Sequence, residues 1–300
     1  MANAKELKDR IRSVGDTRKI TNAMYLIASM KMRKAKAELD GTRPYFEAIR
    51  GEIKRIFRTV QDVQSQYFYP DSGEPPLHGP YACLVITADK GLAGMYNQNV
   101  IKKAEAMLVQ YPDTKLFVVG EYGRQYFARP KIPVERSFLY TAQNPTMQRA
   151  REISEILLEL FRSSAAQKIF VLYTDMKNGL SEEARLERLL PFHRGTFASA
   201  AAEHTGQPIL GVVLDSIIPS YVSGYIYSAL VDSFCSEQNA RMTAMRSAGQ
   251  NAEKLLTQLS GQYNRLRQAA ITREITEISS GAKAQKQAIK KKQNAEVSVL

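Results

Sequence analysis

The last quarter of the chain carries an apolar pattern with the period of a long helix. Residues 221–281 contain no proline, and strong helix formers such as Ala, Leu, Gln, Glu and Arg dominate them. Apolar residues recur there in steps of three or four, at Met245, Ala248, Ala252, Leu255, Leu259, Tyr263, Leu266 and Ala270. This spacing predicts the seam of a coiled coil or long bundle helix. A helix of about 60 residues would be about 90 Å long, too long for the remaining chain to enclose, so it needs a partner.

The N-terminal residues have the same character. A strict 4-3 step runs through Leu7, Ile11, Val14, Arg18, Thr21, Tyr25, Ala28, Met32, Ala35 and Leu39. We expect one helix over residues 1–58, broken or bent between Gly41 and Pro44. Two such stripes at opposite ends of the chain favour an antiparallel pair, which small and polar seam residues would make only modestly stable. An ordinary dimeric coiled coil fits the pattern about equally well.

Between the two helical regions the period changes to that of short buried strands. We expect strands at Tyr81–Thr87, Lys115–Val119 and Lys168–Tyr173, an edge strand at Val134–Tyr140, and helices at Asn97–Gln110, Gly123–Ala128 and Thr146–Ser164. Alternating strands and helices predict an α/β layer fold with a mainly parallel sheet. Residues 180–191 favour a helix by composition but also fit a strand.

The pattern therefore divides the chain into five parts. They are an N-terminal helix at 1–58, a linker or surface loop at 59–80, an α/β domain at 81–215, a C-terminal helix at 216–281 and a basic extension at 282–300. The extension is either a helical continuation or disordered.

Composition narrows the class of protein further. The chain has 300 residues, of which 44% are hydrophobic and 24% charged, as in soluble globular proteins. It contains neither an apolar run of the roughly 18 residues that a membrane span needs nor a signal-peptide pattern. Its two cysteines, Cys83 and Cys235, are consistent with a reducing cytoplasm. The net charge of +12 suits nucleic acid, anionic membranes or acidic protein surfaces, and does not choose among them.

The residues offer little catalytic chemistry. The turn Asp89–Gly94 (DKGLAG) follows a predicted strand, but it has neither the three spaced glycines of a dinucleotide site nor a P-loop ending, so a plain tight turn is favoured. The three histidines are scattered without zinc-ligand spacing, and no nucleophile elbow occurs. We expect no catalytic residue, no cofactor and no metal site. A mechanical or scaffolding part is the favoured class.

Two stretches identify a family. Residues 11–35 read IRSVGDTRKITNAMYLIASMKMRKA, and residues 229–281 include SEQNARM and RQAAITREITEI. Together they closely resemble the terminal signatures of the gamma subunit of F-type ATP synthase. In the middle, VITADKGLAGMYN resembles the family's first strand and turn, and ARLERLLPF resembles its late sheet segment. The resemblance therefore favours a strand within residues 180–191.

The resemblance implies an α/β fold with long terminal helices: an antiparallel coiled coil of the N- and C-terminal helices plus a Rossmann-like α/β middle domain. It implies a central-stalk rotor subunit, one copy per F1Fo complex, that couples proton or sodium flow to ATP synthesis or hydrolysis. The expected partners are the alpha, beta, epsilon and c-ring subunits, with no nucleic acid, and with the membrane reached only through the c-ring. Such a subunit is not an enzyme on its own. Its expected location is the cytoplasmic face of a bacterial cell membrane.

The resemblance also assigns contacts to the ring of alpha and beta subunits. Met24 matches the methionine of the family's KITxAM motif, and Arg241 matches the arginine of NARM. Gln268, Thr272 and Glu274 match polar positions of the RQAAITREI motif. The alternative for each is an ordinary surface or seam residue.

The chain departs from the family at its end, where about 16 further residues follow Ala284, four of them lysines. A lysine-rich segment cannot stay in an apolar sleeve without a desolvation cost, so we expect it to emerge or fold aside. This departure favours, as an alternative, a gamma-like paralogue of a specialised rotary ATPase. A basic coiled-coil protein that binds nucleic acid is a further alternative from another class.

Overall fold

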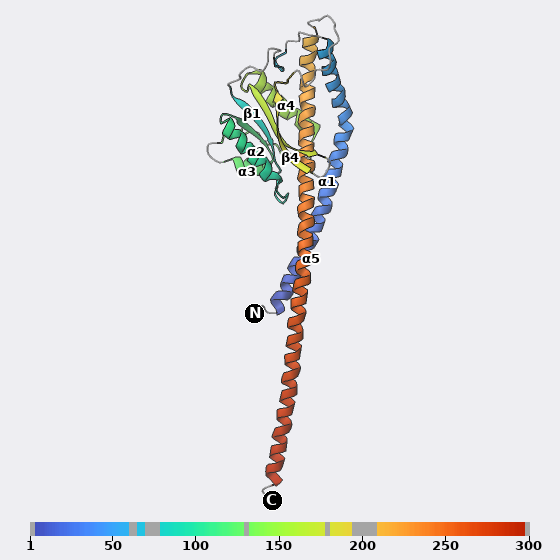
Figure 1. Cartoon of the computed structure of the whole chain (residues 1–300), viewed down its shortest axis with the longest axis vertical. Helices are drawn as coiled ribbons and strands as arrows, with labels where there is room; N and C mark the ends of the chain where they lie inside the picture. The colour runs from blue at the N-terminus through green and yellow to red at the C-terminus, as the bar shows by residue number, and fades with distance from the viewer. Residues whose placement is uncertain are drawn as a thin grey trace. The chain divides into compact units, whose positions relative to one another are not determined.

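A computed structural model of the chain describes residues 4–59, 65–69, 79–128, 132–177, 181–193 and 209–297. The chain divides into two compact units. One unit combines the residues up to Ala23 with those from Met245 onward, and the other runs from Met24 to Ala244. Helices α1 and α5 contribute to both units (Figure 1). Most of the expected linker at 59–80 lies outside the described residues.

Helix α1 spans Ala4–Thr59 without interruption, so of the predicted break or bend between Gly41 and Pro44 the break is wrong, and the bend stays a prediction. Proline in a helix interior removes one backbone hydrogen bond and crowds the preceding turn. Here Pro44 lies on the exposed side of the helix, where water can satisfy the freed carbonyl group. The opposite side is held by packing, since Leu39 and Ile53 are buried.

Helix α5 spans Ile209–Val297, 89 residues, and so begins seven residues before the predicted start at 216. It passes through Pro219, where the neighbouring Ile218 and Val222 are fully buried and stabilise the helix against the proline. At its other end the helix includes the basic extension as far as Val297. Of the two predicted states for residues 282–297, the helical one is therefore found, and residues 298–300 lie outside the described part.

In the unit formed by the chain ends, α1 and α5 run antiparallel. Arg18 Nη1 lies 3.7 Å from Glu253 Oε1, and a Cβ on Gly249 would lie 3.6 Å from Thr21 Oγ1, so α1 numbers fall as α5 numbers rise. The predicted seam is buried at Leu7, Thr21, Met245, Ala252 and Leu259. From residue 267 to 287 every side chain of α5 is exposed.

The two helices are also antiparallel within the unit from Met24 to Ala244. The Cys235 thiol lies 3.8 Å from the Met32 carbonyl oxygen. Farther along, a Cβ on Gly224 would lie only 2.0 Å from the Phe46 ring, so glycine allows this ring to approach the backbone of α5. The predicted antiparallel helix pair is confirmed in each unit.

The larger unit also contains a four-stranded sheet in the order β2-β1-β3-β4. Its elements are β1 (Tyr81–Ile86), α2 (Tyr96–Gln110), β2 (Lys115–Val119), α3 (Glu121–Phe127), α4 (Met147–Arg162), β3 (Lys168–Lys177) and β4 (Ser181–Leu190). Strand β1 is parallel to both β2 and β3, whereas β4 is antiparallel to β3. The predicted mainly parallel sheet is confirmed, and residues 181–190 are a strand.

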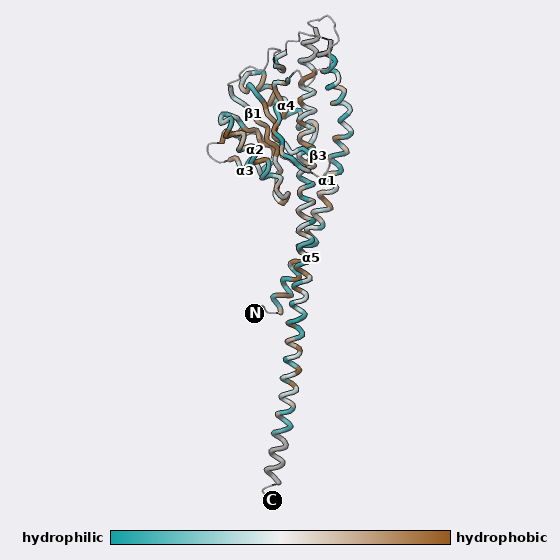
Figure 2. Tube along the Cα trace, viewed as in Figure 1, coloured by the Kyte–Doolittle hydropathy of each residue, from teal (hydrophilic) through white to brown (hydrophobic). Residues whose placement is uncertain are grey.

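The two faces of the sheet belong to different cores. Alternate side chains of β1 point to opposite faces, with Leu84 and Ile86 in one core and Cys83 and Val85 in the other. The first core also contains residues of α1, α4 and α5, and the second contains residues of α2 and α3. In Figure 2 the hydrophobic colours gather on the strands of this sheet.

The predicted edge strand at Val134–Tyr140 is wrong. Val134 forms only an isolated bridge with Leu116, and Lys115 and Glu135 form an ion pair at the same edge. Beyond the bridge the chain turns away from the sheet, with a hydrogen bond from Phe138 N to the Glu135 carbonyl. The apolar Phe138 packs against Phe117 as part of the core rather than as a strand residue.

Candidate functional site

The carboxyl ends of the parallel strands are where a fold of this type binds ligands. The chain leaves β1 for β2 on one side and then crosses to β3 on the other, which makes the end of β1 a topological switch point. In this chain α5 takes that place. The backbone N–H of Thr174 in β3 donates to Ser233 Oγ of α5 at 3.2 Å, and Ser236 Oγ donates to the Thr174 carbonyl at 3.4 Å. The helix therefore covers the crevice.

The turn after β1 is held by its own polar side chains. The Asn97 side-chain oxygen accepts a hydrogen bond from the backbone N–H of Ala88 at 2.9 Å. The Asp89 carboxylate accepts bonds from the backbone N–H groups of Glu121, Ala142 and Gln143, at 3.0–3.1 Å. We call residues 87–94 and 141–143 together the loop cluster. Two residues of this turn have a positive φ, Leu92 at 62° and Gly94 at 54°.

Helix α5 places a buried ion pair beside the loop cluster. Arg241 Nη1 lies 2.7 Å from Glu237 Oε1, one helical turn away, and Arg241 Nη2 donates to the Gly91 carbonyl oxygen at 3.1 Å. Glu237 is fully buried and Arg241 is 9% exposed. Burial raises the pKa of Glu237, and the Arg241 guanidinium offsets part of that rise. Neither Glu237 oxygen receives a well-aligned hydrogen bond within the described part of the chain, so the attraction is chiefly electrostatic.

Helix α1 reaches the same loop cluster from another direction. The Lys31 ammonium group donates to the Gln143 side-chain oxygen at 3.1 Å, in an exposed position. The loop cluster thus contacts both long helices within one compact unit.

The predicted ring contacts fall into two groups. Met24 is half-buried and Arg241 is almost buried, and both belong to the unit with the sheet. Gln268, Thr272 and Glu274 lie on α5 in the other unit, where they are exposed and within two helical turns of one another. Their contact with other subunits stays a prediction.

Sequence reasoning missed Glu237 and Asp89. Glu237 stands four residues before Arg241, a spacing that brings opposite charges together on a helix, so this signal was present in the sequence. The role of Asp89 has no comparable local signal, because its partners come from segments more than 30 residues away.

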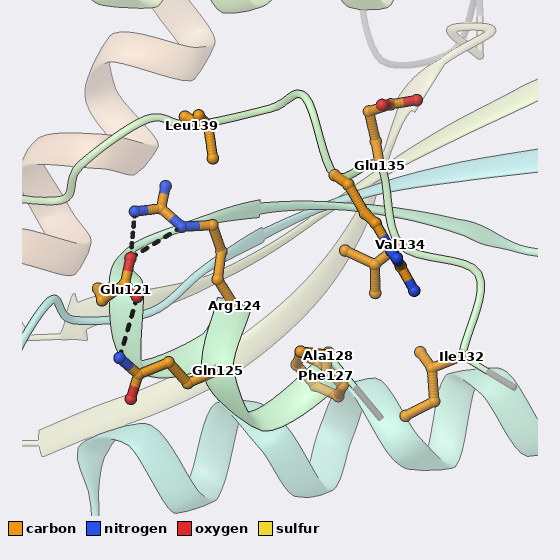
Figure 3. A pocket seen from close by; sticks show the side chains of 10 residues that line it. Glu121, Arg124, Gln125, Phe127, Ala128, Ile132, Val134, Glu135 and Leu139 are labelled. Atoms are coloured by element: carbon orange, nitrogen blue, oxygen red, sulfur yellow. Dashed lines mark hydrogen bonds and ion pairs between the residues drawn. The ribbon is translucent and has the colours of Figure 1, made fainter. Parts of the chain in front are cut away.

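A surface pocket of about 430 Å³ lies between α3 and the segment 132–139 (Figure 3). Its most prominent charges pair internally. Glu121 accepts hydrogen bonds from Arg124 and Gln125, which lower the pKa of its carboxyl group, and Arg124 also donates to the Tyr140 carbonyl at 3.0 Å. Glu135 pairs with Lys115, so the exposed Arg136 is the one lining charge without an ion pair within the described residues.

The described residues also offer little for a metal site, a disulfide or a membrane span. No group of three or more His, Cys, Asp and Glu side chains there is placed to hold a metal ion. Cys83 and Cys235 are free and buried. No described helix is long and apolar enough to cross a membrane.

Comparison with known proteins places the chain in a family. A family model described as ATP synthase matches residues 3–285. The ATP synthase gamma chain of Caldanaerobacter subterraneus subsp. tengcongensis is 44% identical over 287 residues, which cover 91% of this chain and 97% of the relative. That of Ruminiclostridium cellulolyticum is 40% identical over 295 residues, covering 94% and 98%.

Solved structures agree on the fold. A chain of the Euglena gracilis mitochondrial ATP synthase, in a structure of OSCP, F1 and the c-ring, has a TM-score of 0.66 at 15% identity and covers 94% of both chains. A chain of the Tetrahymena thermophila enzyme, in a structure of the central stalk and c-ring, has a TM-score of 0.52 at 21% identity and covers 76% of this chain and 99% of that one. With the family model matched over nearly the whole length, this chain belongs to the ATP synthase gamma-chain family.

Proposed function

We propose that the chain is the central-stalk rotor subunit of a bacterial F1Fo ATP synthase. It would carry rotation of the membrane c-ring to the ring of three alpha and three beta subunits, and so couple proton or sodium flow to ATP synthesis or hydrolysis. The observation that carries the proposal is the uncovered stretch of α5 from residue 267 to 287. Ile271, Ile275 and Ile278 are 45–67% exposed there, as expected for a helix that other subunits surround.

The proposal also states which subunits of the complex bind nucleotide. Because α5 fills the crevice where a doubly wound fold would take a nucleotide, we assign nucleotide binding and catalysis to the alpha and beta subunits. The remaining partners would be the epsilon subunit and the c-ring, with one copy of this chain per complex. The chain would then sit peripherally at the cytoplasmic face of the membrane, which it reaches only through the c-ring.

Affinity purification of the tagged chain from its own host tests this assignment. We expect alpha, beta and epsilon subunits to be recovered with it, and the c subunit after mild membrane extraction. Recovery of nucleic acid without these subunits would refute the rotor assignment and favour a nucleic-acid-binding protein.

Met24, Arg241, Gln268, Thr272 and Glu274 are the proposed contacts with the alpha and beta ring. A rotor must turn without sticking, so its outer contacts should be weak and largely electrostatic, since exposed ion pairs contribute about 0–1 kcal/mol each. The exposure of Gln268, Thr272 and Glu274 supports such contacts, whereas the near-complete burial of Arg241 gives its proposed contact no such support.

The Met24 position gives a sharp test. Met24→Lys would add a charge facing the catalytic ring, and we expect fewer ions pumped per ATP hydrolysed, because a new ion pair holds the rotor at one angle. Met24→Leu, which keeps an apolar side chain of similar size, is the matched control. Equal pumping ratios in the two variants would contradict this placement of Met24.

The C-terminal extension favours a second candidate, a gamma-like paralogue in a specialised rotary ATPase. The family match ends at residue 285, while α5 continues as a helix to Val297. Removal of residues 286–300 separates the candidates. Unchanged assembly and pumping would leave the extension without a specialised role, whereas loss of one particular partner would support the paralogue.

A further inference from the structure

The loop cluster is fastened to the two long helices with unequal strength. On the α1 side, the bond from Lys31 to Gln143 is exposed to water and contributes little. On the α5 side, Arg241 is almost buried, and its guanidinium bridges the Glu237 carboxylate and the Gly91 carbonyl. Hydrogen bonds from charged donors in such dry positions are the strong ones.

The loop cluster is in turn fixed to the sheet. Asp89, two residues before Gly91, binds backbone N–H groups of the segments that follow β2 and precede α4. Thr87, at the end of β1, donates to the Val119 carbonyl at 2.9 Å. A force applied to the α/β part therefore has a continuous polar path to α5 through Gly91 and Arg241.

Apolar packing alone would only weakly resist a force that slides or rotates α5 along the face of the sheet. Such packing is non-directional, and the hydrogen bonds of Ser233 and Ser236 hold α5 to Thr174 of β3 but not to the loop cluster. The hydrogen bond from Arg241 Nη2 to the Gly91 carbonyl is directional, and the charge of Glu237 holds the guanidinium in place, so this contact fixes the angle of the helix. Arg241 also lies three residues before Ala244, where the compact unit containing the sheet ends.

We propose that Glu237 and Arg241 are positioning residues that clamp α5 to the loop cluster, so that torque passes between the α/β part and the helix pair without slip. This inference rests on the proposed rotor function. Glu237 holds the Arg241 side chain in the geometry that reaches Gly91, and neither residue takes part in catalysis.

Three variants of the full-length chain test the clamp. Arg241→Lys keeps the charge but has a single donor nitrogen, so it cannot reproduce the contacts that the two separate nitrogens of Arg241 make with Glu237 and Gly91. Glu237→Gln keeps the shape of the side chain and removes its charge. The exchange Glu237→Arg with Arg241→Glu restores an opposite-charge pair but puts an acceptor where Gly91 needs a donor. Arg246→Lys, at an exposed arginine of the same helix, is the matched control.

The first measurement is hydrogen exchange of the loop cluster in the isolated chain. The backbone N–H groups of Ala88 and Gln143 are hydrogen-bonded there, at 2.9 and 3.0 Å. Loss of a hydrogen bond to a charged group should speed their exchange roughly tenfold or more in Arg241→Lys. Exchange at the wild-type rate would overturn the clamp itself.

The second measurement is the number of ions pumped per ATP hydrolysed in membrane vesicles that contain the complete complex. We expect a lower ratio for Arg241→Lys and for the exchanged pair, with Arg246→Lys at the wild-type ratio. A merely stabilising pair would instead be rescued by the exchange, and full rescue would overturn the inference. Wild-type pumping by Arg241→Lys despite faster hydrogen exchange would also overturn it.

The two measurements distinguish a failure of the clamp from a failure of the rotor assignment. If the wild-type chain formed no complex with alpha and beta subunits, the proposed function would fail, and the torque role of the clamp would fail with it. The hydrogen-exchange result concerns the isolated chain alone, so it would still decide whether the clamp exists.

Discussion

Replacing Asp232 by asparagine should stabilise the protein above neutral pH and leave it almost unchanged in acid. Asp232 lies on α5 and is half-buried. Burial, together with the negative charge of Asp175 on β3, raises the pKa of its carboxyl group from 3.8 to about 6. Arg43 on α1 and a hydrogen bond from Ser228 oppose the rise without cancelling it.

The direction of the change in stability with pH follows from how many protons the folded and the unfolded state bind. Because the folded-state pKa is raised, the folded protein keeps a proton between pH 3.8 and about 6 that the unfolded chain has released. Stability therefore falls as pH rises through this window and stays reduced above it. The ionised Asp232 costs about 2–3 kcal/mol at pH 8, at 1.36 kcal/mol per pKa unit. Asparagine of similar shape removes this cost.

Urea unfolding followed by far-UV circular dichroism checks the prediction, since the chain has no tryptophan. We expect Asp232→Asn to raise the free energy of unfolding by about 2–3 kcal/mol at pH 8 and by much less at pH 4.5. Asp113→Asn, at an exposed aspartate of the same unit, is the control. An equal gain at both pH values, or no gain at pH 8, would refute the assignment of the cost to ionisation.

Three further substitutions probe the fold by the same urea measurement. Gly120→Ala should destabilise the protein by about 3 kcal/mol, because φ is 96° there and the new Cβ would lie 2.3 Å from the Thr87 carbonyl oxygen; retained stability would contradict this backbone geometry. Thr87→Val should cost about 1–3 kcal/mol, since the buried N–H of Gly123 loses its acceptor at 3.0 Å, and a neutral result would mean that water replaces the hydroxyl. Glu253→Gln should change stability by less than about 0.5 kcal/mol, as its pair with Arg18 is exposed, and a larger loss would show that the pair is not screened.

The helix seam could be predicted from sequence because it depends on period alone. The 4-3 step placed Leu7, Ala28, Ala35 and Leu39 on one face of α1, and all four are buried. Arg18 follows the same step but is half-exposed, because its long side chain can extend from the seam to Glu253. Periodicity thus indicates the face of a helix, while side-chain chemistry decides the depth of burial.

Local rules failed where tertiary packing opposed them. Proline normally ends a helix, yet α1 continues through Pro44 and α5 through Pro219, since apolar contacts on the opposite faces outweigh one lost hydrogen bond. Residues 181–190 have a helical composition but form β4. There Arg185 lies 2.8 Å from Asp175 on the neighbouring strand. Helix propensity depends on local sequence alone and does not include such a contact between strands.

The candidate site was only partly predictable for a related reason. Arg241 stood out through the family motif, but its partner Glu237 was passed over, because charged helix residues are normally solvated. Its burial arises from the packing of α5 against the end of the sheet. The position of Asp89 likewise depends on loops that the sequence alone does not bring together.

The polarity of the turn after β1 fits the proposed attachment role better than it fits nucleotide binding. A phosphate needs N–H donors, whereas Gly91 presents its carbonyl oxygen to the Arg241 guanidinium. Stability alone does not explain this pair, since well-packed apolar residues often replace a buried pair without loss. What an apolar pair would lack is a fixed direction of contact between helix and loop. The exchanged pair, which keeps the charges and loses that direction, therefore separates the two explanations for why a charged pair is buried here.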